Sequence, residues 1–284
     1  MIRQARESDL PQLISLWLEA FGDTEEEALF YFQHRHKHQN MLVFEMGSEI
    51  SGMLSTLPVP LHSPKQIISA RYVFAVATKK ARRGQGISTR LLEAAHQKMQ
   101  EEGASASILV PAESSLFEYY GKRGYKTGFQ VDQVHLKAGD ISSWGAEGRL
   151  ERCDAGKYLA IRDDVYKSSQ LFVRWDLYAL QFIMHSAITS GGGMFIISIG
   201  KRQAAAVCEA RGDFIRVTEL ACGKDMWQQA MALIHQHFQS GKYQLRMQEG
   251  SLIEGSTQPF GMIHWLGEPM QATGETPYLA FAKD

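Results

Sequence analysis

The alternation of hydrophobic and polar positions predicts strands and helices in turn along the first part of this 284-residue chain. Residues 2–5 read as a short strand, and apolar positions then recur at helical spacing over residues 10–21. A second helix is expected over residues 24–39, where a threonine N-cap is followed by three glutamates. Residues 41–45 and 49–56 alternate and predict a hairpin, after which three prolines predict a loop.

The most informative pattern lies between residues 67 and 102. An apolar, β-rich run that ends in Tyr72-Val-Phe-Ala-Val-Ala-Thr78 indicates a buried strand. Basic residues and two glycines, Gly84 and Gly86, follow this run, and apolar positions return at helical spacing from Ile87 to Glu102. The sequence therefore predicts a strand that leads through a short glycine-containing loop into a helix.

A loop of this kind is suited to binding a phosphate group. Backbone N–H groups in the first turn of a helix have no partner within the helix, and they lie at the positive end of its dipole. The nucleoside-triphosphate signature Gly-x-x-x-x-Gly-Lys-Ser/Thr does not occur in the chain. The dinucleotide signature Gly-x-Gly-x-x-Gly fails because Thr89 stands at its third glycine. Another phosphate-binding family and a tight turn without a ligand remain as interpretations.

Two motifs together resemble the GNAT N-acetyltransferase superfamily. The string Ala81-Arg-Arg-Gly-Gln-Gly86 resembles the family's acyl-CoA loop, Gln/Arg-x-x-Gly-x-Gly/Ala, although Ala81 departs from the pattern at its first position. The string Tyr119-Tyr-Gly-Lys-Arg-Gly-Tyr125 is similar to the Tyr-x-x-x-Gly-Phe/Tyr signature that closes GNAT domains. It follows a predicted strand at 107–110 and a short helix that begins near Ser114. Both motifs occur in the family's order and at its spacing.

The second half of the chain predicts a similar succession of elements. A composition shift over residues 139–148 indicates a linker. The elements expected after it are a strand at 149–154, helices at 163–175 and 176–190, a strand at 194–199, hairpin strands at 203–210 and 213–222, and a helix capped by Asp225. Gly223-Lys-Asp225 replaces the two-glycine loop there, so a second acyl-CoA site is not expected.

The resemblance implies an α+β fold with a mixed α/β sheet. The string Val217-Thr-Glu-Leu220 is similar to the degenerate second domain of the bacterial "enhanced intracellular survival" acetyltransferases, which join two GNAT-like domains. We therefore expect two GNAT-like domains in tandem, each a central twisted, mostly antiparallel sheet flanked by helices. Residues 1–138 are the expected catalytic domain, 149–284 the degenerate domain and 139–148 the linker.

The composition bears on which ligands the protein binds and on where it is located. A net charge of −1 argues against nucleic-acid binding, and the three cysteines form no zinc or redox pattern. The alternating histidines in His34-Arg-His-Lys-His38 indicate a solvated helix end rather than a metal site. No signal region and no long apolar run occur, so no membrane association and a cytoplasmic location are expected. The sequence leaves the oligomeric state open, a homodimer included.

The resemblance also implies where a co-substrate binds and which residues contact it. Acetyl-CoA is the expected co-substrate, with no metal. Its pantetheine arm should lie along the edge of the predicted strand, with the thioester carbonyl near the backbone N–H of Val76. The pyrophosphate should lie at the loop and the start of the helix, where Arg82 and Arg83 could compensate for Ala81. The residues expected to bind the co-substrate are Phe74, Val76, Ala77, Thr78, Arg82, Arg83, Gly84, Gln85, Gly86, Ile87, Ser88, Thr89 and Ser114.

Tyr120 occupies the position of the family's general acid. A phenol with a pKa near 10 is protonated at neutral pH and can give its proton to the departing thiolate. The alternative interpretation of Tyr120 is a core aromatic whose hydroxyl bonds to the backbone. No acidic residue occurs in Tyr72–Ala77 to serve as the general base. Glu113 is a conceivable substitute, but an acidic residue at the N-terminus of a short helix is more often a cap. The general base is therefore left unassigned. Some relatives use the terminal carboxylate, a role that does not transfer to Asp284.

Three functions are consistent with these residues. The first is an acetyl-CoA-dependent N-acetyltransferase in which a primary amine of a small molecule or peptide attacks the thioester directly. The second is a non-catalytic acyl-CoA-binding or sensing protein. The third is an acyltransferase that uses a longer acyl group or a hydroxyl acceptor. A tyrosine retained at the acid position favours the first function over the second.

Overall fold

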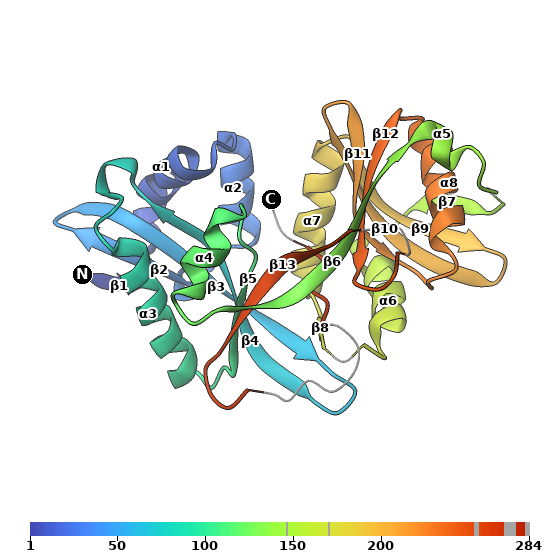
Figure 1. The fold of residues 1–284 in the computed structure, drawn as a ribbon. Helices are drawn as coiled ribbons and strands as arrows, with labels where there is room; N and C mark the ends of the chain where they lie inside the picture. Colours follow the sequence, from blue (N-terminus) through green and yellow to red (C-terminus); the bar gives the residue numbers. More distant parts are fainter. Residues whose placement is uncertain (146, 170, 253–255, 270–276, 282–284) are drawn as a thin grey trace. The chain divides into compact units, whose positions relative to one another are not determined.

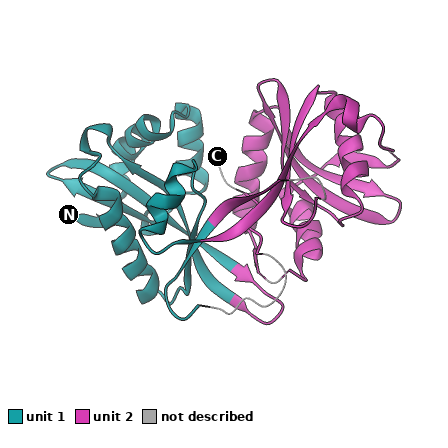
Figure 2. Cartoon of the chain, viewed as in Figure 1, with its two compact units in different colours: residues 1–60, 68–126, 262–271 teal, residues 61–67, 127–261, 272–284 magenta. Residues whose placement is uncertain are grey.

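The computed structural model describes every residue except 146, 170, 253–255, 270–276 and 282–284 (Figure 1). The chain forms two compact units, each of which is discontinuous in sequence (Figure 2). Unit 1 comprises residues 1–60, 68–126 and 262–271, and unit 2 comprises residues 61–67, 127–261 and 272–284. Each unit contains strands of a mixed sheet together with helices, as expected for an α+β fold.

Unit 1 is built mainly from the first half of the chain. Its strands follow the order β1-β2-β3-β4-β5-β13, in which β4 and β5 are parallel and the pairs β1–β2, β2–β3 and β5–β13 are antiparallel. The elements are β1 (Ile2–Gln4), η1 (Glu7–Asp9), α1 (Leu10–Phe21), α2 (Glu25–His34), η2 (His38–Asn40), β2 (Met41–Met46), β3 (Glu49–His62), β4 (Ile67–Thr78), η3 (Lys80–Arg82), α3 (Ile87–Glu101), β5 (Ala106–Leu109), α4 (Ser115–Gly121) and the end of β13 (Ser256–Trp265).

Different helices cover the two faces of the unit 1 sheet. The apolar side of α3 packs in one core cluster with Leu54, Val73 and Tyr120, so α3 and α4 share a face. On the opposite face Tyr31 of α2 bonds to Ser55, the neighbour of Leu54 along β3, at 2.8 Å. Because successive strand residues point to opposite faces, β4 presents Val73 to α3 and α4 and its next residue to α1 and α2.

Unit 2 repeats this plan with the later elements. Its strands follow the order β13-β6-β12-β11-β10-β9-β7, and β11 and β12 are its parallel pair. The elements are β6 (Lys126–Lys137), α5 (Ala138–Ile141), β7 (Arg149–Arg152), α6 (Ala155–Tyr166), β8 (Phe172–Val173), α7 (Leu177–Thr189), β9 (Gly193–Ile199), β10 (Arg202–Arg211), β11 (Phe214–Ala221), α8 (Trp227–Phe238), β12 (Lys242–Gln248) and the start of β13.

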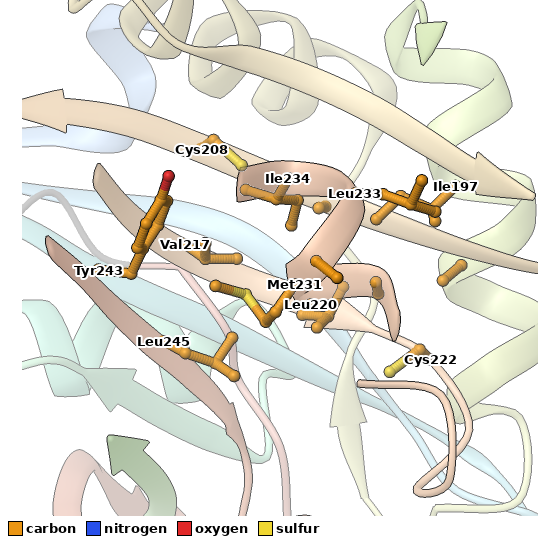
Figure 3. Packing of buried hydrophobic residues seen from close by; sticks show 14 of the residues in the cluster. Ile197, Cys208, Val217, Leu220, Cys222, Met231, Leu233, Ile234, Tyr243 and Leu245 are labelled. Carbon is orange, nitrogen blue, oxygen red and sulfur yellow. The ribbon is translucent and has the colours of Figure 1, made fainter. Parts of the chain in front are cut away.

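The core of unit 2 lies between α8 and the sheet (Figure 3). Met231 and Ile234 of α8 are fully buried against side chains of β11 and β12, including Val217 and Leu245. The expected linker contributes to this core, because Ile141 is buried in it and Trp144 packs against it. Residues 139–148 therefore include packed structure, although their composition predicts a linker.

The strands β6 and β13 do not follow the domain division that the sequence predicts. Most of β6 belongs to unit 2 although it precedes the expected boundary at residue 138, and it pairs antiparallel with β12. The strand beside β5 is instead β13, whose residues from Met262 onward belong to unit 1. The expected boundaries at residues 138 and 149 thus divide the chain at a different place from the two units. Strand order depends on long-range pairing, which the local pattern of each strand does not specify.

Several predicted elements have different limits in the structure. β3 continues to His62 where prolines predicted a loop, with Pro58 exposed within the strand. Proline is tolerated in a strand where its position needs no N–H donor. α2 ends at His34 rather than near residue 39. His36, beyond that end, is half-buried and shares a hydrogen bond of 3.0 Å with His38, so these histidines do not form a solvated helical turn.

The expected helix at 163–175 is wrong, because α6 begins at Ala155 and ends at Tyr166. Asp154 caps α6, since its side chain accepts from the backbone N–H of Lys157 at 2.8 Å. Asp225 is not the N-cap of α8. That position belongs to Met226, and Asp225 forms an exposed ion pair with Arg202.

A fully buried ion pair joins α6 to β11 in unit 2. Arg162 Nε donates to both carboxylate oxygens of Glu219, at 3.1 and 3.0 Å, and Nη1 donates to the carbonyl of Val173 at 2.8 Å. The hydroxyl of Tyr158 donates a hydrogen bond to the same carboxylate. Both charged side chains have no exposed area. Removing one charge leaves the other unpaired in the interior, which is strongly destabilising.

We expect Glu219→Gln to lower the free energy of unfolding by about 3 kcal/mol, because Arg162 then keeps a buried charge without its counter-ion. Urea denaturation followed by circular dichroism measures this change. Asp213→Asn is the matched control, since Asp213 lies beside β11 but forms an exposed pair with Lys242. Its free energy of unfolding should stay close to that of the parent. Equal effects of the two substitutions would contradict the role given to the buried pair.

Candidate active site

The candidate site begins where β4 separates from β5. The two strands pair in parallel at Ala70–Ala106, Arg71–Ser107 and Tyr72–Ile108, and no further pair follows among the described residues. β4 nevertheless continues to Thr78, six residues beyond the last pair. Its backbone on that side is an unpaired strand edge, which an extended amide chain can complete by strand addition.

The separated part of β4 contains an irregularity at Ala75. This residue has a φ of 52°, a conformation that residues other than glycine rarely adopt. Tyr72 and Val73 are both buried in succession, so the usual alternation is also interrupted here. A strained residue inside a strand reorients the adjoining peptide groups, and such residues concentrate at functional sites. The backbone of Val76, where sequence analysis places the oxyanion donor, directly follows this point.

The loop after β4 has the conformation that its glycines permit. Gly84 and Gly86 have φ values of 78° and 73°, and Gly86 is the N-cap of α3. Gly86 has no side chain to cap the first turn of α3, so its backbone N–H groups receive no capping acceptor from the N-cap residue. Both glycines are exposed, and a Cβ atom at either would meet nothing within 4 Å. The need for glycine here arises from the φ angle and not from lack of space.

A further glycine lets α3 approach the sheet closely. A Cβ atom at Gly52 of β3 would lie 2.7 Å from a methyl group of Ile87. Ile87, the first residue of α3, is therefore buried rather than available to a ligand side chain, and only its backbone N–H can serve the site. Sequence analysis missed Gly52, because its role depends on the tertiary contact.

The basic residues around the loop are partly held by the protein itself. Arg82 lies 3.5 Å from the carboxylate of Glu49, which also binds Lys79 at 2.6 Å. The hydrogen bond from Lys79 holds the pKa of Glu49 below its usual range. Arg83 donates to the carbonyl of Thr78 at 3.3 Å. These cations still surround the loop with positive charge, but Arg82 shares its charge with a carboxylate.

Several other predicted residues lie close to the loop. Ser88 Oγ shares a hydrogen bond of 2.6 Å with the hydroxyl of Tyr119, and Thr89 Oγ1 accepts from Arg123 at 2.6 and 3.1 Å. Arg90, which sequence analysis missed, donates to the carbonyl of Gln85 at 3.3 Å. A side-chain pattern at helical spacing could not distinguish these contacts from an ordinary exposed helix face.

The other predicted residues divide between backbone and side-chain roles. The ring of Phe74 packs toward α1 and α2, 5.9 Å from Trp17 and 5.4 Å from Tyr31, so only its backbone belongs to the β4 edge. The buried Oγ1 of Thr78 has no hydrogen-bond partner among the described residues. A buried polar atom without a partner therefore lies at the end of the unpaired edge.

Ser114 and Glu113 are less closely integrated into the site. Ser114 is the exposed N-cap of α4, and its side chain makes no capping bond. Glu113 is also exposed, with Ser115 as its hydrogen-bond donor at 3.5 Å. This single contact does not identify Glu113 as the general base. The terminal Asp284 lies outside the described residues.

Tyr120 presents a free hydroxyl from a buried ring. Its side chain is packed in the core cluster of unit 1 and is 7% exposed. Its hydroxyl makes no hydrogen bond within the described part of the chain, and it is not among the fully buried polar atoms that lack a partner. Burial raises its pKa to about 12, with a smaller contribution from Tyr119. The phenol therefore remains protonated across the neutral range, with its proton available to a ligand.

Tyr125 shows the contrasting arrangement. Its hydroxyl bonds to Ser107 at 2.6 Å and to His96 at 2.9 Å, so its hydrogen-bonding capacity is used inside the protein. Burial lowers the pKa of His96 to about 4, and this imidazole is accordingly neutral at pH 7. The Tyr125 ring lies 5.7 Å from that of Tyr120 in an edge-to-face contact. The two neighbouring tyrosines thus differ in whether a protein group occupies the hydroxyl.

In unit 2 a parallel pair of strands also separates, but different side chains lie at the separated strand. β11 and β12 pair from Ile215 to Val217 and then separate. Glu219 lies two residues past the last pair, as Phe74 does in unit 1, and it is bound by Arg162 and Tyr158. Buried side chains of unit 2 therefore engage the separated strand.

Comparison with known proteins agrees with this geometry. Residues 1–128 match the family model described as an acetyltransferase (GNAT) domain. This segment makes up less than half of the chain, and it is similar to the acetyltransferases that the family model describes. No curated protein matches the sequence. Among the described residues, no helix is long and apolar enough to cross a membrane.

Solved structures resemble the chain across both units. A GCN5-related N-acetyltransferase from Anabaena variabilis has a TM-score of 0.77 at 16% identity, over 94% of this chain and 73% of its own. One from Kribbella flavida has a TM-score of 0.73 at 14% identity, over 93% and 70%. Eis1 from Mycobacterium abscessus has a TM-score of 0.66 at 10% identity, over 94% and 74%. At these identities the likeness establishes the fold, and it confirms the expected α+β fold of two GNAT-like domains in tandem.

We expect Gly86→Asp to weaken acetyl-CoA binding by at least about tenfold, which corresponds to 1.4 kcal/mol. The substitution places a carboxylate at the N-terminus of α3, where the bound phosphates need the backbone N–H groups. Isothermal titration calorimetry measures the dissociation constant. Gly212→Asp is the matched control, because Gly212 also has a positive φ, 58°, and open space around it. An equal loss of affinity in both variants would show that backbone strain alone causes the effect.

We also expect one acetyl-CoA to bind per chain. Unit 2 lacks the two-glycine loop before α8, and Glu219 at its separated strand is already bound by buried partners. The stoichiometry of the same calorimetric titration tests this expectation. Two equivalent sites per chain would contradict the interpretation of unit 2 as a degenerate copy.

Proposed function

We propose that the protein is an N-acetyltransferase that transfers the acetyl group of acetyl-CoA to a primary amine of a small molecule or peptide. The observation that carries the proposal is the Tyr120 side chain, a buried phenol whose hydroxyl has no partner among the described residues. A hydroxyl that only stabilised the core would be expected to bond within the protein, as that of Tyr125 does. Tyr120 instead keeps its proton available.

Two features of unit 1 support the binding of CoA. The backbone edge of β4 from Val73 to Thr78 is free of β5 and can pair with the amides of the pantetheine arm. The uncapped first turn of α3 can bind the pyrophosphate, with basic side chains around it. The edge and the helix start are joined by one short loop. A single extended ligand can therefore engage both.

The proposed reaction is direct acyl transfer. The amine nitrogen attacks the thioester carbonyl, and the N–C bond forms as the carbonyl oxygen becomes an oxyanion. The backbone N–H of Val76 is the proposed donor to that oxygen, next to the irregularity at Ala75. The C–S bond then breaks, and the thiolate takes the proton of Tyr120. The attacking amine loses a proton, and we assign no side chain to that step.

The alternative of a non-catalytic acyl-CoA sensor shares the binding features but does not need the phenol. A thiol-release assay with acetyl-CoA and a panel of primary amines distinguishes the two functions. Amine-dependent release of CoA is the expected result. Stabilisation of the fold by acetyl-CoA without release in any amine would favour the sensor. A hydroxyl acceptor or a longer acyl group would show itself by a preference for alcohols or for other thioesters in the same assay.

We expect Tyr120→Phe to lower kcat by about a hundredfold to ten-thousandfold while the affinity for acetyl-CoA stays near that of the parent. The substitution removes only the hydroxyl and keeps the packed ring. Steady-state kinetics with an accepted amine and calorimetry with acetyl-CoA measure the two quantities. Because the pKa of Tyr120 is about 12, loss of activity through its ionisation should not occur below about pH 10.

Tyr125→Phe is the matched control in the same cluster. It removes a hydroxyl that Ser107 and His96 bind, so the free energy of unfolding should fall by about 1 kcal/mol. Turnover should remain near that of the parent, because this hydroxyl does not face the ligand in the proposed arrangement. Tyr120→Phe with kcat within about threefold of the parent would rule out the phenol as the acid.

A further inference from the structure

Arg123 connects the two helices that carry the candidate site. It is the second residue after α4, and its guanidinium lies over the ring of Tyr119, 3.4 Å from the ring centroid. Nη1 donates to the carbonyl oxygen of Tyr119 at 2.6 Å. Nε and Nη2 donate to Oγ1 of Thr89 on α3, at 3.1 and 2.6 Å. One guanidinium therefore binds the end of α4 and the first turn of α3 at the same time.

A second bond runs beside the first. The hydroxyl of Tyr119 shares a hydrogen bond of 2.6 Å with Oγ of Ser88. We refer to Ser88, Thr89, Tyr119 and Arg123 as the α3–α4 clasp. Ser88 and Thr89 are the second and third residues of α3, in the turn whose N–H groups we expect to bind phosphate. The clasp thus links the phosphate end of the site to the helix that carries Tyr120.

Helix α4 depends on such contacts for its position. It has only seven residues, from Ser115 to Gly121, and a helix of two turns is not stable by itself in water. Gly124, just beyond it, has a φ of 84°, so the chain turns sharply away. The hydroxyl of Tyr120 has no partner among the described residues, so its position there depends on its ring packing and on the placement of α4.

The charge of Arg123 also acts on Tyr120. Burial raises the pKa of Tyr120, and the positive charge of Arg123 opposes this rise. A proton donor must become an anion at the moment it reacts, and a nearby cation stabilises that anion. Lysine in the place of Arg123 would supply the charge but not a planar fork that reaches two acceptors and stacks on a ring.

We propose that Arg123 is a positioning residue that acts through Tyr120, because the α3–α4 clasp holds the phenol against the thioester of a CoA bound at the start of α3. The proposal rests on the proposed function, in which Tyr120 is the general acid. Misplacement of a reacting group by about 1 Å can cost up to a hundredfold in rate. The role is therefore in kcat and not in the affinity for acetyl-CoA.

Arg123→Gln and Arg123→Lys should each lower kcat by about tenfold to a hundredfold, with the dissociation constant of acetyl-CoA within about threefold of the parent. Lys122→Gln is the matched control. Lys122 neighbours Arg123 and carries the same charge, but it forms an exposed pair with Glu118 and has no bond to α3. Its kcat should equal that of the parent. Thermal melting in the presence of acetyl-CoA confirms that each variant is folded.

A double-mutant cycle tests whether Arg123 acts through the phenol. In a Tyr120→Phe background the group to be positioned is gone, so Arg123→Gln should lower kcat by less than a further threefold or so. If Arg123→Gln does not fold, Thr89→Val replaces it in the cycle, because it removes the accepting hydroxyl and keeps the backbone N–H.

The outcomes that overturn the inference differ from those that overturn the proposed function. Parent-like kcat in Arg123→Gln, beside an impaired Tyr120→Phe, overturns the positioning role alone. A raised dissociation constant with unchanged kcat would make Arg123 a phosphate ligand instead. Fully multiplicative losses in the cycle would show a general structural role. A parent-like Tyr120→Phe would overturn the assignment of the acid itself, and the positioning role with it.

Discussion

The separation of β4 from β5 is the constraint on which the rest of the site depends. Three parallel pairs end at Tyr72–Ile108, and the remaining length of β4 keeps an edge with unpaired backbone groups. Such an edge normally invites pairing with another chain, and here it lies directly before the uncapped start of α3. The strained Ala75 interrupts the same segment. One strand thereby provides the edge, the irregular peptide and the approach to the anion-binding turn.

The two units have the same arrangement of separated parallel strands, but only unit 1 has the features proposed to bind a ligand there. In both, a parallel pair separates after three residue pairs, with a helix beginning beyond the longer strand. In unit 1 the polar atoms Thr78 Oγ1 and Tyr120 Oη have no partner among the described residues. In unit 2, Glu219 at the separated strand is bound by a buried arginine and tyrosine. The units thus share their strand topology but differ at the separated strand, where unit 2 contains a fully buried ion pair.

The contrast between Tyr120 and Tyr125 follows the same rule. Both rings are buried in one cluster and both phenols have raised pKa values, so burial alone does not distinguish them. The Tyr125 hydroxyl is bound by Ser107 and His96, which fixes it as part of the core. The Tyr120 hydroxyl has no partner among the described residues and remains available to a ligand, and this difference is the basis of the chemistry proposed for Tyr120.

The sequence by itself determined the features that depend on neighbours in the chain. The positive φ of Gly84 and Gly86 and the helical spacing after Ile87 are local properties, and they placed the loop and α3 correctly. The motif around Tyr120 likewise located α4. The tertiary structure alone decided which strands are neighbours, since β6 and β13 pair with strands distant in sequence. It also decided the bonds of Arg123 and the buried partners of Glu219, because those contacts exist only after distant segments have packed together, and no local pattern of side chains encodes them.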